Sequence, residues 1–190
     1  MTEHQPLDTS PLPVKLRVED YLLLDDAGAF DGYAKTELIE GEIVSMNAQH
    51  RPHARVKSRL HVLLASALQD LGAGMEALVE GSVAMPPHSV PEPDIAVTAE
   101  PEGDGLIPLA SLALIVEIAD STLQNDLGRK QQLYAREGVP EYWVVDVIGR
   151  MIHQFWGAGC EAYAGRRMVA FGDRIAAETV AGLAVETKGL

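Results

Sequence analysis

The chain has 190 residues, of which 47% are hydrophobic and 23% are charged, and its formal net charge at pH 7 is −13. This length and composition indicate a globular chain with one domain and exclude a disordered one. The acidic balance argues against broad, nonspecific adhesion to nucleic acid, although a local basic patch or a bound cation can invert the local field. No apolar run in the sequence approaches the roughly 20 residues that span a bilayer.

The N-terminal segment predicts a flexible arm, residues 1–17, ahead of a single domain over residues 18–190. Three prolines and no hydrophobic periodicity in residues 1–13 support this boundary. The start of the chain has neither a basic segment nor an apolar signal core. The single cysteine, Cys160, cannot form an internal disulfide, which suits a reducing compartment. We therefore expect a cytoplasmic protein without a membrane segment.

The first predicted elements of the domain are a short helix and a hairpin. Residues 18–24 carry apolar side chains at helical spacing, and the helix is expected to end before Gly28. Residues 35–46 predict two strands around Glu40-Gly41, because glycine supplies the positive φ that a tight hairpin demands.

A long helix is predicted from Pro52, which fits a first helical turn, to Gly72, which marks an end. One apolar stripe runs along it at helical spacing, through Val56, Leu60, Leu63, Leu64, Ala67, Leu68 and Leu71. His53 extends this stripe towards the N-terminus of the helix. A separate basic row at a spacing of four consists of Arg51, Arg55 and Arg59.

The remaining elements complete an α/β pattern. In chain order we expect strands at 75–80, 82–85, 94–98 and 112–119, a helix at 123–137, and a hairpin of strands at 141–147 and 150–156. The segment 157–190 is weakly specified. This order predicts an α/β layer arrangement with a mixed β-sheet flanked by helices.

Two of the predicted strands carry one acid each. Asp94 opens the first strand. Glu117 lies in the second, residues 112–119, and all the remaining residues of that strand are apolar. A carboxylate there is costly to bury unless a charged group meets it. If the strands are neighbours, Asp94 and Glu117 can converge on one cation, and two carboxylates plus waters are a usual way to hold magnesium. The alternatives are a strand start or turn cap for Asp94 and a structural ion pair for Glu117.

The helix at 123–137 carries three polar residues, Asp126, Lys130 and Tyr134, whose spacing of four places them on one face. Lys130 has a flexible stem and can reach over the sheet to orient a nucleophile or a substrate phosphate. The alternative is a solvated ion pair between Asp126 and Lys130, which is common and worth little energy.

The ordered set of motifs resembles the PD-(D/E)XK restriction-endonuclease-like superfamily and, more narrowly, its Uma-type endonuclease-like family. The resemblance covers residues 18–156 and rests on Glu37-Leu38-Ile39-Glu40-Gly41-Glu42, the helix beginning near His53, Pro93-Asp94-Ile95, Val116-Glu117-Ile118, Asp126-x-x-x-Lys130-x-x-x-Tyr134 and Glu141-Tyr142-Trp143-x-x-Asp146.

This resemblance implies a restriction-endonuclease-like core and a nuclease that depends on Mg²⁺ or Mn²⁺ and cleaves nucleic acid, with DNA as the expected substrate. It implies metal ligation by Asp94 and Glu117. The superfamily lysine is expected two residues after the acid, where this chain has Ala119, and Lys130 is similar to the migrated lysine of the Uma-type family. Glu37 and His53 match positions that flank the family's site; a solvent-facing hairpin residue and a structural helix start are the respective alternatives.

Two functions remain open at this stage. The acidic composition and the absent lysine at Ala119 favour a catalytically inactive binding or assembly module. The joint retention of Asp94, Glu117 and Lys130 favours the enzyme, because a decayed site is expected to lose at least one of the three.

Partners are expected at two surfaces. The basic row on the long helix is expected to border the cleft and track the phosphate backbone, with a solvated helix face as the alternative. Duplex cleavage needs two scissions, which a two-fold homodimer readily supplies. The hairpin at 141–156 offers an interface if its aromatic residues are exposed, whereas the alternative is that they fill the core: Trp143, Phe155 and Trp156.

Overall fold

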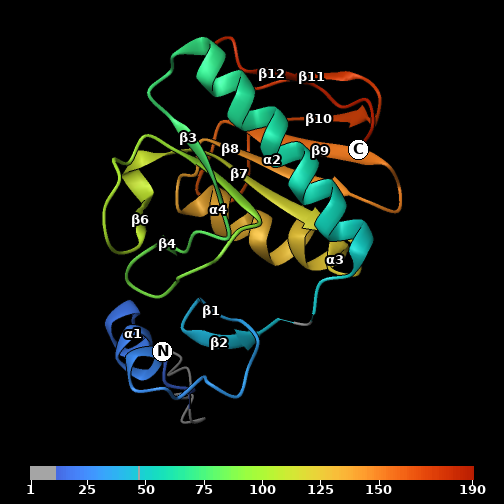
Figure 1. Cartoon of the computed structure of the whole chain (residues 1–190). Helices are drawn as coiled ribbons and strands as arrows, with labels where there is room; N and C mark the ends of the chain where they lie inside the picture. The colour runs from blue at the N-terminus through green and yellow to red at the C-terminus, as the bar shows by residue number, and fades with distance from the viewer. Residues whose placement is uncertain (1–11, 47) are drawn as a thin grey trace, which may run out of the picture.

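The computed structural model describes residues 12–46 and 48–190 (Figure 1). Residues 1–11 of the expected arm lie outside this described part. At the end of the arm, the Leu16 N–H donates to the carbonyl of Gly41 at 3.1 Å, and Lys15 pairs with Glu42 at 2.7 Å. Residues 15 and 16 therefore run along the first hairpin.

A mixed sheet of six strands forms the centre, as the sequence predicted. Its order is β10-β9-β8-β7-β5-β3, and only the β7–β8 pairing is parallel. The helical segment between β7 and β8 provides the long crossover that a parallel pair requires. The strands, in spatial order, are Gly165–Ala170, Met151–Trp156, Glu141–Asp146, Leu112–Ala119, Ile95–Thr98 and Glu76–Val79.

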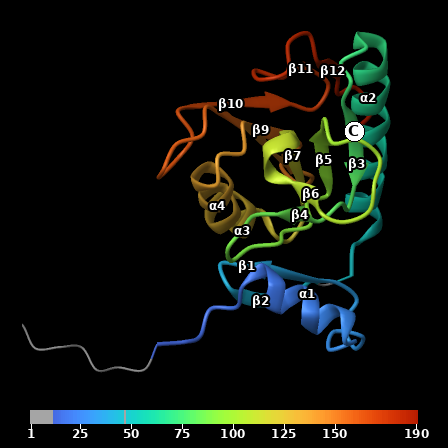
Figure 2. The same cartoon turned by 90° about the vertical axis from the view of Figure 1, so that its left-hand side faces the viewer.

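Helices cover both faces of this sheet (Figures 1 and 2). The long helix α2 (Arg51–Leu71) packs Val56, Leu60, Leu64 and Leu68 against one face. On the other face, the segment 123–136 buries Leu133 and Tyr134. Side chains alternate along β7, so the two cores share its residues between them. No helix in the described part of the chain is long and apolar enough to cross a membrane.

The helix predicted at 123–137 is not uniform. It consists of α3 (Leu123–Asn125), a π-helical turn η2 (Asp126–Lys130) and α4 (Gln131–Arg136). A π-turn is wider than an α-turn, and such turns concentrate at functional sites. Gly128 at its centre has a low propensity for a regular α-helix. Asp126 and Lys130, the first and last residues of this turn, are both buried.

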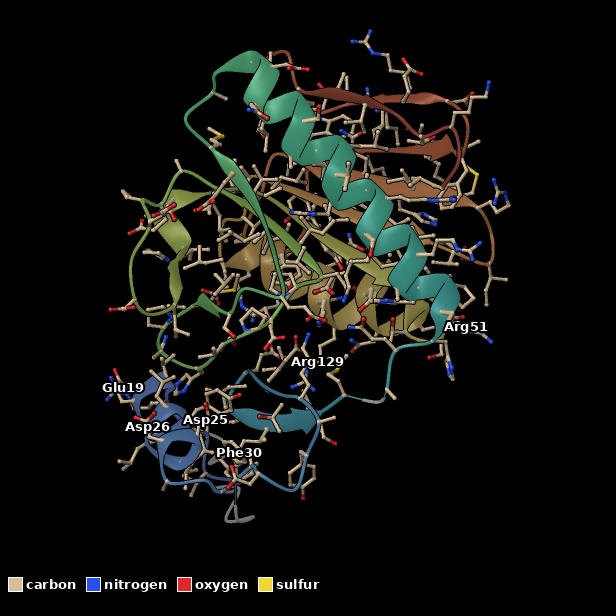
Figure 3. All side chains as sticks on the ribbon, viewed as in Figure 1. Glu19, Asp25, Asp26, Phe30, Arg51 and Arg129 are labelled. Atoms are coloured by element: carbon tan, nitrogen blue, oxygen red, sulfur yellow. The ribbon has the colours of Figure 1, made fainter. Side chains whose placement is uncertain are left out.

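A small layer packs below the sheet in Figure 1. It contains α1 (Val18–Asp26) and the hairpin of β1 (Thr36–Ile39) with β2 (Glu42–Ser45). The hairpin turns at Glu40 and Gly41, which both have positive φ, as expected from the glycine. Arg129 of η2 holds the hairpin to the main body through Glu40 at 3.1 Å and Glu42 at 2.9 Å (Figure 3).

The remaining short elements complete the chain. The extended segments β4 (Val83–Ala84) and β6 (Ile107–Pro108) pair in parallel, ahead of the 3₁₀ turn η1 (Leu109–Ser111). In the tail, β11 (Arg174–Ala176) pairs with β12 (Ala184–Glu186). The tail thus contributes β10 to the main sheet and a further two-stranded sheet.

The expected aromatic interface on the hairpin of β8 and β9 is wrong for two of its three residues. Trp143 is 0% exposed and Phe155 is 7% exposed. Trp143 belongs to β8, which lies inside the sheet between β7 and β9, and it packs into one core. Phe155 belongs to β9 and packs against Tyr142 and Tyr163 in the other core. Trp156 is partly exposed, but the guanidinium of Arg167 lies over its ring, 5.5 Å from the centroid.

Candidate active site

One pocket collects the predicted polar residues. It has a volume of about 390 Å³ and is bounded by the hairpin β1–β2, the start of α2, the end of β7 and the segment α3–η2. Six of the predicted site residues line it: Glu37, His53, Asp94, Glu117, Asp126 and Lys130.

Strand pairing brings the two acids together. The antiparallel partners Ile95 and Val116 set the register of β5 against β7. Asp94 precedes Ile95 and Glu117 follows Val116, so the two acids occupy the next opposed position. The prediction that they lie on adjacent strands is confirmed.

Glu117 is held by two donors from the neighbouring helix. Its Oε1 accepts hydrogen bonds from Lys130 Nζ at 2.9 Å and from the Tyr134 hydroxyl at 2.8 Å. Burial raises the pKa of Glu117 to about 8, although the charge of Lys130 opposes this shift. Burial alone would lower the pKa of Lys130, but the charges of Glu117 and Glu37 raise it above its ordinary value. Lys130 is therefore a buried cation.

Asp126 shares the pocket but does not pair with Lys130. Its Oδ2 accepts from the Thr122 hydroxyl at 2.6 Å, and its Oδ1 accepts from the Asn125 amide at 3.4 Å. Burial raises the pKa of Asp126. The alternative of a solvated Asp126–Lys130 pair is wrong, because both residues are buried and Lys130 meets Glu117 and Glu37 instead.

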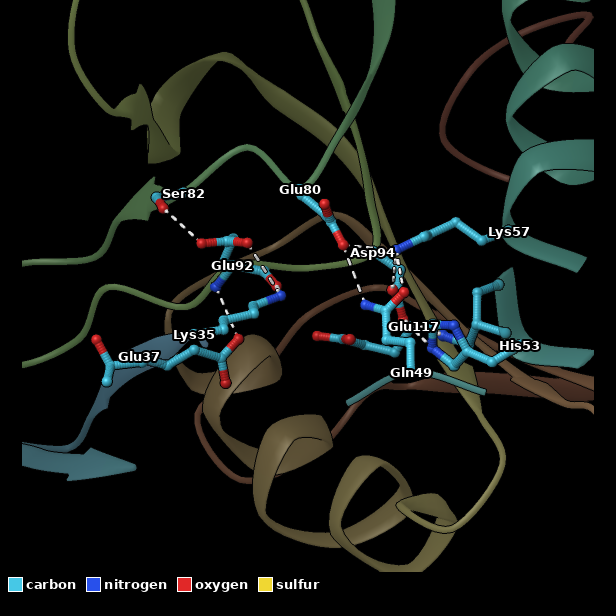
Figure 4. A network of polar contacts seen from close by, with 12 residues as sticks. Lys35, Glu37, Gln49, His53, Lys57, Glu80, Ser82, Glu92, Asp94 and Glu117 are labelled. Carbon is cyan, nitrogen blue, oxygen red and sulfur yellow. Dashed lines mark hydrogen bonds and ion pairs between the residues drawn. The ribbon is translucent and has the colours of Figure 1, made fainter. Parts of the chain in front are cut away.

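Asp94 is held by three donors, of which Figure 4 shows His53 and Lys57. Its Oδ2 accepts from the backbone N–H of Ile118 at 2.8 Å and from His53 Nε2 at 3.2 Å. Its Oδ1 forms an ion pair with Lys57 at 3.3 Å. Burial raises the pKa of Asp94, but the hydrogen bond and charge of His53, the Ile118 amide and the charge of Lys57 together hold it below its ordinary value. Asp94 is therefore a carboxylate at neutral pH.

Glu37 is fully buried, so the alternative of a solvent-facing hairpin residue is wrong. Its Oε1 accepts from the Glu92 N–H at 2.8 Å and from Lys130 Nζ at 3.2 Å. Its Oε2 and the Nδ1 of His53 are buried without a hydrogen-bond partner among the described residues. Such unpartnered groups are uncommon and mark places where a water or an ion fits.

Sequence reasoning did not assign Lys57 to the site. Lys57 is buried and contacts Asp94. The available signal was its spacing of four from His53, which places both residues on the same helix face. Arg51, Arg55 and Arg59 are exposed and lie outside the lining of the pocket. Figure 3 places Arg51 at the start of α2.

The pocket offers oxygen ligands for a divalent cation. No group of three or more His, Cys, Asp or Glu side chains within residues 12–46 and 48–190 is arranged to hold a metal. A magnesium ion does not require one, since it commonly uses one or two carboxylates together with waters and substrate phosphates. Glu117 Oε2 accepts no hydrogen bond from the described residues, and Asp94 Oδ1 contacts only Lys57. The donor set therefore fits Mg²⁺ or Mn²⁺.

This fold is that of the restriction-endonuclease-like nucleases, with a mixed sheet that presents one acid from each of two adjacent strands beside a lysine from the following helix. The chain belongs to the Uma2 family, described as "Putative restriction endonuclease", whose model matches residues 18–188. The resemblance drawn from the motifs is confirmed, and the match extends through the tail.

A solved structure supports the same fold. The chain is similar to a "putative nuclease belonging to DUF820" from Anabaena variabilis, with a TM-score of 0.69 and 15% sequence identity. The alignment covers 90% of this chain and 95% of the other. A comparison with curated proteins gives no match.

Proposed function

We propose that this protein is an endonuclease that depends on Mg²⁺ or Mn²⁺ and hydrolyses phosphodiester bonds of DNA in the cytoplasm. Membership of the Uma2 family supports a nuclease-like function. One observation carries the proposal: Asp94 and Glu117 enter one pocket from paired strands, and a buried lysine, Lys130, meets Glu117 there.

The free carboxylate oxygens define the proposed ligands. Both lone pairs of Asp94 Oδ2 are engaged by Ile118 and His53, so Oδ1 is the atom left for the ion. Both lone pairs of Glu117 Oε1 are engaged by Lys130 and Tyr134, which leaves Oε2. A divalent cation at these oxygens supplies charge neutralisation at the phosphate and a lower pKa for a bound water.

Lys130 is placed to orient the reacting groups. Its ammonium has three N–H donors, of which two reach Glu117 and Glu37. The third is available within the pocket for a phosphate oxygen or the attacking water. Tyr134 keeps Glu117 oriented, His53 does the same for Asp94, and Asp126 supports the rim beside Thr122.

The charges that are not neutralised within the protein support a DNA path. Most of the described Lys and Arg side chains form an ion pair with an acid. The described cations without such a pair are Arg51, Arg55, Arg59, Arg150, Arg166 and Lys188. Arg59 and Arg150 donate to the adjacent carbonyls of Gly189 and Leu190. We propose that the phosphate backbone follows α2 from its start, beside the pocket, towards the tail.

A homodimer belongs to the same proposal. A chain with one site cuts one strand at a time, and a two-fold pair of chains cuts both strands of a duplex. Because Trp143 and Phe155 fill the core, the interface must use another surface. Light scattering at micromolar concentration, with and without duplex DNA, checks this part of the proposal; a monomer under both conditions would contradict it.

The proposed activity is tested with supercoiled plasmid, linear DNA and RNA in Mg²⁺, Mn²⁺ or EDTA. We expect nicking of DNA that needs the cation and is lost in Lys130→Met. Ala119, buried in β7 where the superfamily lysine stands, favours the second candidate, an inactive binding module. That candidate predicts that DNA binds and Mn²⁺ raises the melting temperature, with no cleavage under any condition.

A further inference from the structure

A second buried lysine, Lys57, contacts Asp94, the other proposed metal ligand. Lys57 is 7% exposed, and its Nζ lies 2.6 Å from Glu80 Oε1, 2.6 Å from Gln49 Oε1 and 3.3 Å from Asp94 Oδ1 (Figure 4). The Gln49 amide also donates to Glu80 at 3.0 Å. Three oxygens thus surround one ammonium group, and one of them is the oxygen proposed to bind the metal.

The surroundings of Lys57 differ from those of Lys130. Lys130 lines the pocket, whereas Lys57 and Glu80 lie outside its lining. Gln49 and Asp94, which Lys57 contacts, do line the pocket. All three ammonium donors of Lys57 face protein oxygens, so none is left for a substrate phosphate. Lys57 is therefore not placed to bind substrate, and it can affect the site only through its contact with Asp94.

We propose that Lys57 is a positioning residue that serves as an internal counter-ion of Asp94 and weakens the binding of a divalent cation in the absence of substrate. Lys57 engages Oδ1 and places a positive charge next to the site of the ion, and like charges at short range repel. Glu80 and Gln49 counterbalance it, because the shorter contacts at 2.6 Å draw Lys57 away from Asp94.

This inference rests on the proposed metal site and adds a consequence for substrate binding. A bound phosphate brings negative charge that offsets the repulsion between Lys57 and the cation. The metal is then held more firmly when DNA is present than when it is absent. The pocket is meanwhile stable without metal, since each of its two ligand carboxylates is paired with its own lysine.

Two variants test the inference because they act in opposite directions. Lys57→Met removes the charge and keeps an apolar stem, so Mn²⁺ should bind about tenfold more tightly, because a positive charge that repels the ion at short range is gone. The metal-free variant should melt at a lower temperature, because Asp94 loses a counter-charge. Glu80→Gln removes the negative charge that draws Lys57 away from Asp94, so Mn²⁺ should bind several-fold more weakly. Lys15→Met removes an equal charge from the exposed pair with Glu42 and should leave the affinity unchanged.

The measurements are calorimetric titrations with Mn²⁺ alone and thermal unfolding with and without Mn²⁺, on the full chain without nucleic acid. Unchanged or weaker binding by Lys57→Met overturns the inference and leaves the proposed nuclease intact if the wild type binds Mn²⁺. If Lys57→Met does not fold, Glu80→Gln provides the test: unchanged or tighter Mn²⁺ binding by this variant overturns the proposed role of Lys57. If neither the wild type nor any variant binds Mn²⁺, the metal-dependent function is overturned together with it.

Discussion

The ammonium group of Lys130 lies 2.9 Å from Oε1 of Glu117, and the two residues are 3% and 5% exposed. The lysine is therefore part of the folded core as well as of the pocket, and its removal leaves buried acids without a counter-charge. Stability and the proposed catalysis therefore depend on the same contact, so each variant of the site needs both measurements.

Lys130→Met is expected to lower the free energy of unfolding by about 3–5 kcal/mol, because it removes the buried cation that meets both Glu117 and Glu37. The matched control is Arg136→Met, whose pair with Glu40 is exposed and worth at most about 1 kcal/mol. Urea unfolding of both variants gives the comparison. Equal losses in the two would show that the buried pair contributes no more than a surface one.

The stability of the metal-free protein is expected to fall as pH rises from about 5.5 to 8. Burial raises the pKa of Glu117 to about 8, so folding favours its protonated form. That contribution is complete below the unfolded pKa, near 4.3, and is lost as pH rises through about 8. The slope should be about 1 kcal/mol per pH unit steeper than in Glu117→Gln. Denaturant unfolding across this range makes the measurement, and parallel slopes would contradict the prediction.

The same ionisation couples metal binding to pH. A metal ligand must be deprotonated, so Mg²⁺ affinity should rise by up to tenfold per pH unit between about pH 6 and 8. Titration calorimetry in buffers of different ionisation enthalpy should detect close to one proton released at pH 6.5. Release of no proton would mean that Glu117 is already ionised or does not bind the ion.

Tyr134→Phe removes the second hydrogen bond to Glu117 Oε1 and is expected to cost about 1–3 kcal/mol of stability and to change metal affinity. Tyr142→Phe is the control, since its hydroxyl is also buried but donates to the backbone carbonyl of Asp126 at 3.1 Å. The control should lose stability without a change in Mn²⁺ affinity. Identical Mn²⁺ affinities of the two variants would show that Tyr134 has no influence on metal binding.

The double variant Arg55→Ala, Arg59→Ala is expected to weaken DNA binding and to lower the salt slope by roughly one unit for each lost phosphate contact. Mn²⁺ affinity should not change, because both residues lie outside the pocket. The control replaces Arg17 and Arg174, exposed arginines that already pair with acids. Fluorescence anisotropy at several salt concentrations makes the comparison; equal slopes for wild type and variant would place the DNA elsewhere.

Local sequence patterns determined many of the secondary-structure elements of this protein. The apolar stripe of α2, the positive φ at Gly41 and the apolar run around Glu117 each predicted an element that the structure contains. These signals are local because helix and strand periodicities repeat within a few residues. The family was also predictable, since its motifs are short and ordered along the chain.

Only the tertiary structure decided which residues meet in the pocket. Glu37 and Lys57 lie far from Glu117 and Asp94 in the sequence, and their burial depends on how the hairpin and α2 pack against the sheet. For Trp143 the sequence favoured the core only slightly over an interface, and the position of β8 inside the sheet decided for the core. Periodicity specifies which face of an element is apolar, but long-range packing selects the partner of that face, and with it the charge that each buried acid meets.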